Sequence, residues 1–73
     1  MVTLQQRFGR VMRKRREAAN LSQERLAELA GLHRTYISLL ERGKRMPSLE
    51  VLRVVALGLN TTMTALVKEL EAS

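Results

Sequence analysis

The sequence predicts an all-α fold, a compact bundle of five helices that form one domain over residues 1–73. Leucine and alanine dominate the composition, whereas proline occurs once and aromatic residues twice. Apolar residues recur at helical spacing, and serine, threonine, glycine and asparagine stand where helices would begin and end. The chain has no cysteine and one histidine, so neither a disulfide nor a zinc site is expected to support the small core.

The first helix is expected to begin near Leu4, because Thr3 and Gln6 have the spacing of a capping box. It should continue to about Ala19 and turn its apolar stripe toward the core. That stripe consists of Leu4, Phe8, Val11 and Met12. Gly9 lies within this helix, where glycine costs about 1 kcal/mol relative to alanine, and close packing against another helix would explain its presence.

Residues 21–47 predict two short helices joined by a tight turn and followed by a basic loop. Ser22 can accept a hydrogen bond from a free backbone N–H at the start of the first of these two helices. Gly31 can end that helix in the left-handed conformation, which costs other residues energy. The second helix should begin near residue 33 or 34 and end at Gly43. In the first of these two short helices, the apolar residues are Leu26, Ala27, Leu29 and Ala30.

The second of these helices has two different faces. Its inward-facing residues should be Ile37, Leu40 and Glu41. At about 100° per residue, the opposite face carries Thr35, Ser38, Leu39 and Arg42. A short helix that presents hydroxyl and guanidinium groups, and that packs on another helix, is the layout of a helix-turn-helix.

Two further helices should follow the basic loop. Ser48 can cap a helix over residues 49–57, and Thr61 or Thr62 can cap a last helix that ends near residue 70. The inner residues of these two helices should be Leu49, Leu52, Val55, Ala56, Leu66 and Val67.

Positive charge is concentrated in two segments of a chain whose formal net charge is +6. Residues 1–20 hold six basic residues and one acid, and residues 31–47 hold four basic residues and one acid. A solvated face is the common explanation for one charged helix. Because two basic segments surround the motif here, we expect a polyanionic partner, double-stranded DNA.

The sequence disfavours several other classes of protein. No secretory signal is visible, and the longest apolar run, Val54–Leu59, is too short to cross a bilayer, so we expect a cytoplasmic protein that joins the nucleoid when bound to DNA. All seven acids are glutamates without a nearby histidine or cysteine, and no glycine-rich phosphate loop is present. We therefore expect no enzyme, no cofactor, no metal and no small-molecule substrate.

The motif contains the strings Ser22-Gln23-Glu24, Leu26-Ala27, Gly31, Tyr36-Ile37-Ser38, Glu41-Arg42-Gly43 and Pro47-Ser48-Leu49. Together they resemble the phage repressor and Cro helix-turn-helix family, and the likeness covers about residues 4–70. The string Arg34-Thr35-Tyr36-Ile37-Ser38 is also similar to the recognition helix of controller proteins from bacterial restriction–modification systems. The resemblance implies a five-helix domain that binds operator DNA as a dimer and sets transcription of a nearby gene.

The resemblance implies a base-reading role for Arg34, Thr35 and Ser38. Arg34 suits a bidentate contact to guanine O6 and N7, although a phosphate contact is an equal alternative. Thr35 could touch a thymine methyl group. Leu39 stands where many relatives have a polar reader, so an apolar contact with a thymine methyl is left open in place of a hydrogen bond.

Other residues are expected to contact the DNA backbone. They are Arg16, Gln23, His33, Tyr36, Arg42, Lys44 and Arg45. The family likeness also implies that Arg16 pairs with Glu41 between the first and third helices. His33 could instead cap its helix, Tyr36 could be packing, and the loop residues Lys44 and Arg45 could be merely solvated.

A two-fold homodimer is expected through the last helix and the turn before it. Met63, Leu66 and Leu70 recur there at helical spacing, although all three could instead complete the core of one protomer. Two other functions remain as alternatives. The same fold could serve as an antitoxin-like or adaptor module for a protein partner, or it could bind RNA, which the scarcity of aromatic residues disfavours.

Overall fold

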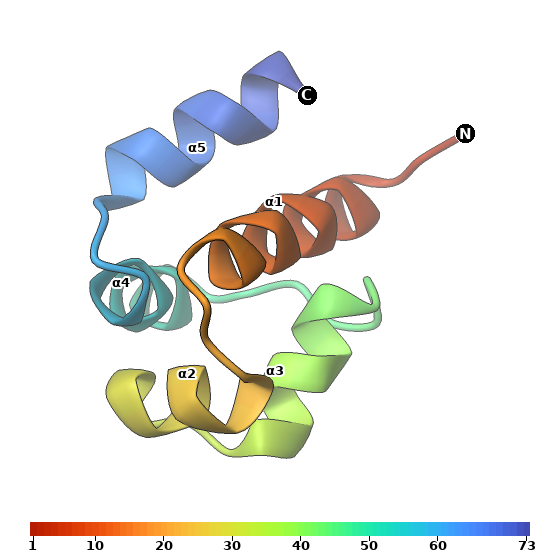
Figure 1. The fold of residues 1–73 in the computed structure, drawn as a ribbon. Helices are drawn as coiled ribbons and strands as arrows, with labels where there is room; N and C mark the ends of the chain where they lie inside the picture. The colour runs from red at the N-terminus through yellow and green to blue at the C-terminus, as the bar shows by residue number, and fades with distance from the viewer.

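A computed structural model describes all 73 residues and contains five helices and no strand. The helices are α1 (Leu4–Ala18), α2 (Gln23–Ala30), α3 (Arg34–Glu41), α4 (Leu49–Gly58) and α5 (Met63–Ala72). In Figure 1, α1 crosses the middle of the molecule, with α5 above it and the α2–α3 pair below it. The all-α fold predicted from the sequence is confirmed, and the helix boundaries agree within about two residues.

Short polar side chains fix where the helices begin. Thr3 and Gln6 form the expected capping box, in which the Gln6 N–H donates to Thr3 Oγ1 at 3.1 Å and the Thr3 N–H donates to Gln6 Oε1 at 3.0 Å. Ser22 and Ser48 cap α2 and α4, as predicted. Of the two candidates for α5, the cap is Thr62, whose Oγ1 accepts from the Ala65 N–H at 3.0 Å.

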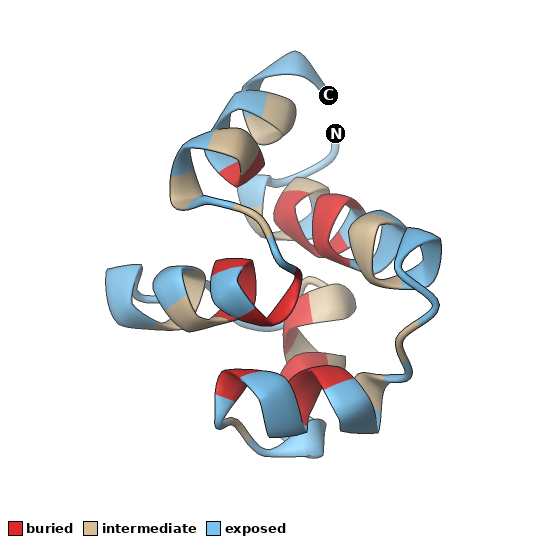
Figure 2. Ribbon diagram, turned by 60° about the vertical axis from the view of Figure 1, so that its left-hand side comes forward, coloured by how far each residue is buried: buried red, intermediate tan, exposed pale blue.

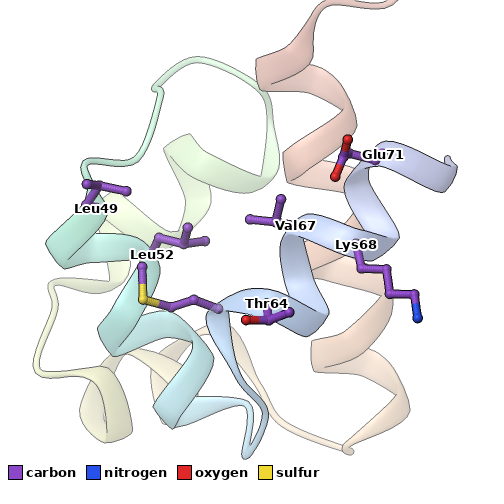
Figure 3. A pocket seen from close by; sticks show the side chains of 7 residues that line it. Leu49, Leu52, Thr64, Val67, Lys68 and Glu71 are labelled. Atoms are coloured by element: carbon purple, nitrogen blue, oxygen red, sulfur yellow. The ribbon is translucent and has the colours of Figure 1, made fainter.

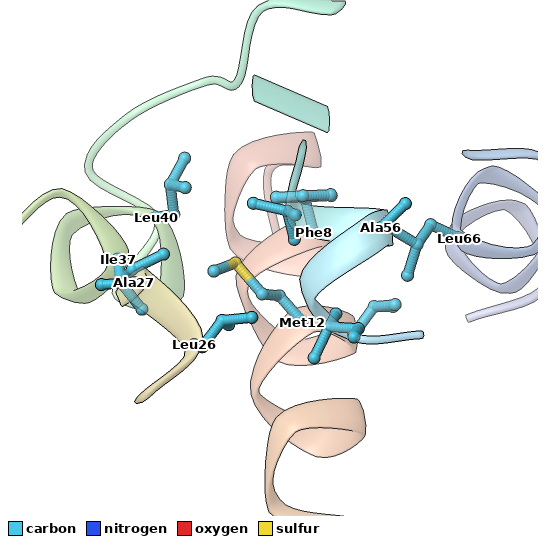
Figure 4. Close-up of a cluster of buried hydrophobic side chains, with 11 residues drawn as sticks. Phe8, Met12, Leu26, Ala27, Ile37, Leu40, Ala56 and Leu66 are labelled. Carbon is cyan, nitrogen blue, oxygen red and sulfur yellow. The ribbon is translucent and has the colours of Figure 1, made fainter. Parts of the chain in front are cut away.

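The core lies where all five helices face one another, as the buried residues in Figure 2 show. Met12 lies at the centre of the cluster in Figure 4, with Leu26 and Ile37 toward α2 and α3 and Leu66 toward α5. The fully buried side chains come from every helix and include Met12, Leu26, Ile37, Leu40, Val55 and Leu66.

Three predicted inner residues are exposed, and a fourth, Leu52, is half-buried. Leu4 is exposed in the first turn of α1, Leu49 is 77% exposed at the start of α4, and Val67 is 38% exposed on α5. Each has the right spacing for a core position, but no further helix covers the ends of α1 and α4 or this side of α5. Leu49 and Val67 lie instead on either side of an open groove between α4 and α5.

Gly9 marks the closest approach of α1 to α3. A β-carbon at this position would lie 2.5 Å from the Glu41 carbonyl oxygen and 2.6 Å from that of Leu40. Both atoms belong to the backbone at the end of α3, so neither can move aside as a flexible side chain would. The expected reason for this glycine, close packing against another helix, is confirmed.

Polar contacts attach α5 to α1. Arg15 donates from Nε to Glu69 Oε1 at 2.6 Å and from Nη1 to Thr61 Oγ1 at 3.1 Å. Lys14 adds a longer ion pair to the same carboxylate at 3.7 Å. The hydrogen bond from Arg15 holds the pKa of Glu69 below its ordinary value, so the carboxylate stays charged where it joins the two helices.

No single helix is both long and apolar enough to cross a membrane. Only α4 and α5 taken together reach the required length and composition, and they are bent by 100° at the break between them.

The close approach at Gly9 predicts that Gly9→Ala destabilises the fold, although alanine is the better helix former. A clash with backbone atoms should outweigh the gain in helix propensity and lower the free energy of unfolding by about 1–3 kcal/mol. Urea unfolding measures this change. The difference between Arg10→Ala and Arg10→Gly, at an exposed position in the same helix, gives the propensity effect alone. A Gly9→Ala protein that is as stable as the parent would contradict the close approach.

Candidate nucleic-acid interface

The turn between α2 and α3 is closed by two local features. Gly31 ends α2 in the left-handed conformation, with φ +69°. His33 then caps α3, because the Thr35 N–H donates to His33 Nδ1 at 3.2 Å. A ring nitrogen that accepts a hydrogen bond carries no proton, so the cap uses the neutral imidazole. The capping role of His33 suggested by the sequence is confirmed, and its contact with DNA stays a prediction.

One face of α3 is buried and the other is open. Ile37 and Leu40 are fully buried against the core. Arg34, Thr35 and Arg42 are exposed, while Ser38 and Leu39 are half-buried on the same outer side. Tyr36 packs against the core with part of its surface, in line with the packing alternative.

The Glu41 carboxylate joins three segments beneath this face. Arg16 donates to it from Nε at 2.6 Å and from Nη2 at 3.0 Å, and Gln23 Nε2 donates at 3.0 Å. The Arg16 Nη1 donates to the Leu21 carbonyl oxygen at 2.7 Å. The side chains of Arg16 and Glu41 are 11% and 3% exposed. We call these three side chains, Arg16, Gln23 and Glu41, the Glu41 cluster.

The Glu41 cluster confirms the predicted pairing of Arg16 with Glu41. The hydrogen bond to Glu41 raises the pKa of the Arg16 guanidinium in spite of its burial, so the guanidinium stays charged. Sequence reasoning missed the third member, because it considered Gln23 only as a DNA contact. The contacts of Arg16 and Gln23 with the DNA backbone stay predictions, and each would use the N–H groups that the cluster leaves free.

Part of the positive charge of α1 is neutralised by glutamates, whereas Arg7 and Arg10 on the same helix form no salt bridge. On α1, Arg13 pairs with Glu17, Lys14 and Arg15 pair with Glu69, and Arg16 pairs with Glu41. In contrast, Arg34, Lys44 and Arg45 are exposed and form no salt bridge. The only acid between residues 31 and 47 is Glu41, which faces Arg16. The open face of α3 and the loop after it therefore present uncompensated cations.

This geometry agrees with a match between residues 12–66 and the family described as helix-turn-helix. The chain belongs to the helix-turn-helix family. Its members of the Cro/C1 type are DNA-binding transcriptional regulators, and this chain is one of them.

Several relatives in the helix-turn-helix family are controller proteins. The chain is 49% identical over 55 residues to control protein C.SmaI of Serratia marcescens, covering 75% of this chain and 66% of that protein. It is 42% identical to control protein C.MunI of a Mycoplasma species, covering 89% of each.

Its fold also resembles the crystal structure of the restriction–modification controller C.AhdI from Aeromonas hydrophila. That comparison gives a TM-score of 0.83 and 40% identity, covering 85% of this chain and 94% of that one. Controllers and regulators are not enzymes, which confirms that expectation for this chain.

The residues predicted for a dimer interface do not share one surface. Leu66 is fully buried within the protomer, where it completes the core, so its assignment to the interface is wrong. Met63 is half-buried and lines the groove between α4 and α5. Leu70 packs against the core and lines an adjacent apolar hollow. The other apolar residues that line the groove, Leu49, Leu52 and Val67, were instead expected inside.

The Glu41 cluster predicts that Arg16→Ala destabilises this helix-turn-helix domain and weakens DNA binding together. Loss of Arg16 leaves a nearly buried carboxylate with only Gln23 as its partner, and breaking such a pair costs about 3–5 kcal/mol. Thermal unfolding should show a lower melting temperature. The matched control is Arg25→Ala, which breaks the exposed pair with Glu28 and should cost less than about 1 kcal/mol. Equal melting temperatures for the two variants would count against the structural role of the cluster.

Proposed function

We propose that this protein is a sequence-specific transcriptional regulator of the restriction–modification controller type. It binds a near-palindromic operator as a homodimer, with α3 of each protomer in the major groove. The observation that carries this proposal is the open face of α3. It presents hydroxyl, guanidinium and methyl groups, carries no free carboxylate and is held at a fixed angle by a buried ion pair. The controller relatives support the same class of function.

Different residues of this surface are proposed to contact base edges and phosphates. The side chains at the N-terminal end of α3 can enter the major groove, so Arg34, Thr35, Ser38 and Leu39 are proposed to contact base edges. The groups around them hold the phosphates and fix the register of the protein on the duplex. We propose Arg16, Gln23, His33, Tyr36, Arg42, Lys44 and Arg45 for that role.

The groove between α4 and α5 supports the homodimer. Figure 3 shows Leu49 and Leu52 on α4 facing Val67 on α5 across it. Its volume is about 460 Å³, and Met63, Lys68 and Glu71 also line it. A lining of apolar residues together with opposite charges suits a self-complementary contact between two copies. Such a dimer would place its two α3 helices about 34–36 Å apart, one turn of DNA.

The test of this function separates residues that contact base edges from residues that contact phosphates. Arg34→Ala should cost about 1–3 kcal/mol chiefly on the operator and relax the preference at one base pair in each half-site. Lys44→Ala should weaken binding to operator and scrambled DNA alike, because a phosphate contact carries no base information. It should also reduce the slope of affinity against salt by about one unit.

The operator for this test comes from selection of bound duplexes out of a random pool. Both variants are then titrated against operator and scrambled duplexes at several salt concentrations. If Arg34→Ala weakens both duplexes equally, Arg34 holds a phosphate and its assignment as a reading residue fails. If the parent protein selects no sequence from the pool, the proposed function itself fails.

The groove predicts that Leu49→Lys gives a monomer. Leu49 is 77% exposed, so the substitution should leave the fold intact while it places a charge in the apolar contact. Sedimentation at micromolar concentration measures the change, and operator affinity should fall with it. Leu57→Lys is the matched control, because Leu57 is 62% exposed on the same helix but does not line the groove. A parent protein that is monomeric and binds one copy per site would contradict the dimer.

A further inference from the structure

Ser38 and Arg42 are linked on the open face of α3. The Nε–H of Arg42 donates to Ser38 Oγ at 3.2 Å, across one turn of the helix. Arg42 is exposed and Ser38 is half-buried, so both groups can reach a partner outside the protein. The Ser38 hydroxyl accepts this bond and donates to no acceptor within the protein. Its hydrogen is therefore available to a ligand.

We infer that Arg42 is a positioning residue that makes the Ser38 hydroxyl a hydrogen-bond donor toward the DNA. Ser38 would then select an acceptor atom on a base edge, for which guanine with its N7 and O6 is the best fit. This inference rests on the proposed function and deepens it. It also changes the role of Arg42, which was expected only to hold a phosphate.

The chemistry of the Ser38 hydroxyl indicates that it donates a hydrogen bond to the DNA and does not accept one from it. A serine hydroxyl has one hydrogen and two lone pairs, and the guanidinium occupies one lone pair. The positive charge beside the oxygen draws electrons from the O–H group, which strengthens it as a donor. The same charge repels the amino hydrogens of adenine N6 or cytosine N4. The pair therefore favours acceptors.

Because the four bases differ in the acceptors that they present, a hydroxyl that donates its hydrogen has a sequence preference. In the major groove guanine offers two acceptors, N7 and O6, thymine offers O4, and adenine offers N7 beside an amino group. Cytosine offers only its N4 amino group. We therefore expect Ser38 to face guanine in preference and cytosine least of the four bases on the contacted strand.

The position of Arg42 separates it from the other cations of this surface. Lys44 and Arg45 lie on the loop after α3 and have no side-chain partner. Arg42 follows the last residue of α3, and its Nε points back along the helix to Ser38. Its two terminal nitrogens stay free, so it can add charge near the DNA while its Nε orients the hydroxyl.

The experiment measures base preference at every operator position for the parent protein and its variants. Ser38→Ala and Arg42→Ala should relax the preference at the same base pair of each half-site, by roughly 2- to 10-fold each. The double variant should relax it no further than Ser38→Ala alone, because the two residues act through one hydroxyl. Arg45→Ala is the matched control and should weaken all sequences alike.

Two further measurements check the chemistry. The contacted guanine is replaced with 7-deazaguanine, which lacks N7, and with 2-aminopurine, which lacks O6. The replacement that removes the acceptor of the single Ser38 hydrogen should weaken binding of the parent protein but not of Ser38→Ala. In the free protein, the NMR signal of the Arg42 Nε–H should shift in Ser38→Ala, because its acceptor is lost. Melting temperatures should stay at the parent value, since both residues lie on the surface.

The outcomes distinguish this inference from the proposed function. If Arg42→Ala lowers affinity for operator and scrambled DNA equally, or if the contacted base is cytosine, the role of the pair is overturned while sequence-specific binding stands. If additivity is found in the double variant, Arg42 acts separately from Ser38 and the inference fails. If the parent protein shows no sequence preference at all, the inference and the proposed function fail together.

Discussion

The orientation of α3 depends on one buried carboxylate. Glu41 lies at the end of the helix and is 3% exposed, so its charge would be costly without partners. Arg16 and Gln23 supply three N–H donors, and Arg16 also donates to a carbonyl in the connection between α1 and α2. Charge-assisted bonds have strict geometry. The Glu41 carboxylate, which would destabilise the fold if it were buried without partners, thereby aligns α1, α2 and α3 with one another.

A steric contact complements this polar one on the same side of α1. Gly9 and Arg16 are seven residues apart, almost two helical turns, so they face α3 together. Gly9 lets the backbones meet near the Glu41 carbonyl oxygen, and Arg16 binds the carboxylate of the same residue. Two contacts at separate points on α1 leave α3 little freedom to tilt. That rigidity matters for the proposed base contacts, because side chains read bases only when they are held in the correct register.

The sequence predicted the helices of the fold well. It predicted less well which of their apolar residues are buried by a neighbouring helix. Caps such as Thr3 and Ser22 act on their own helices, so local spacing was enough to find them. Leu49 and Leu66 have the same apolar character and helical spacing, yet one is exposed and the other buried. Periodicity states which side of a helix is apolar, but the tertiary arrangement decides whether a neighbour covers it. For the same reason Gln23 could be assigned to the motif but not to Glu41, which lies on another helix.

Two pairs of arginines in this domain have different roles, and the presence of a glutamate partner decides between them. Arg15 and Arg16 are bound to glutamates in or near the core, so their charge stabilises the fold. Arg34 and Arg45 have no acid beside them, so their charge is available to a polyanion. The residues that fix α3, such as Ile37 and Glu41, are buried on its other side. Under the proposed function, substitutions on the open face can therefore alter which sequence is bound without altering how the helix is held.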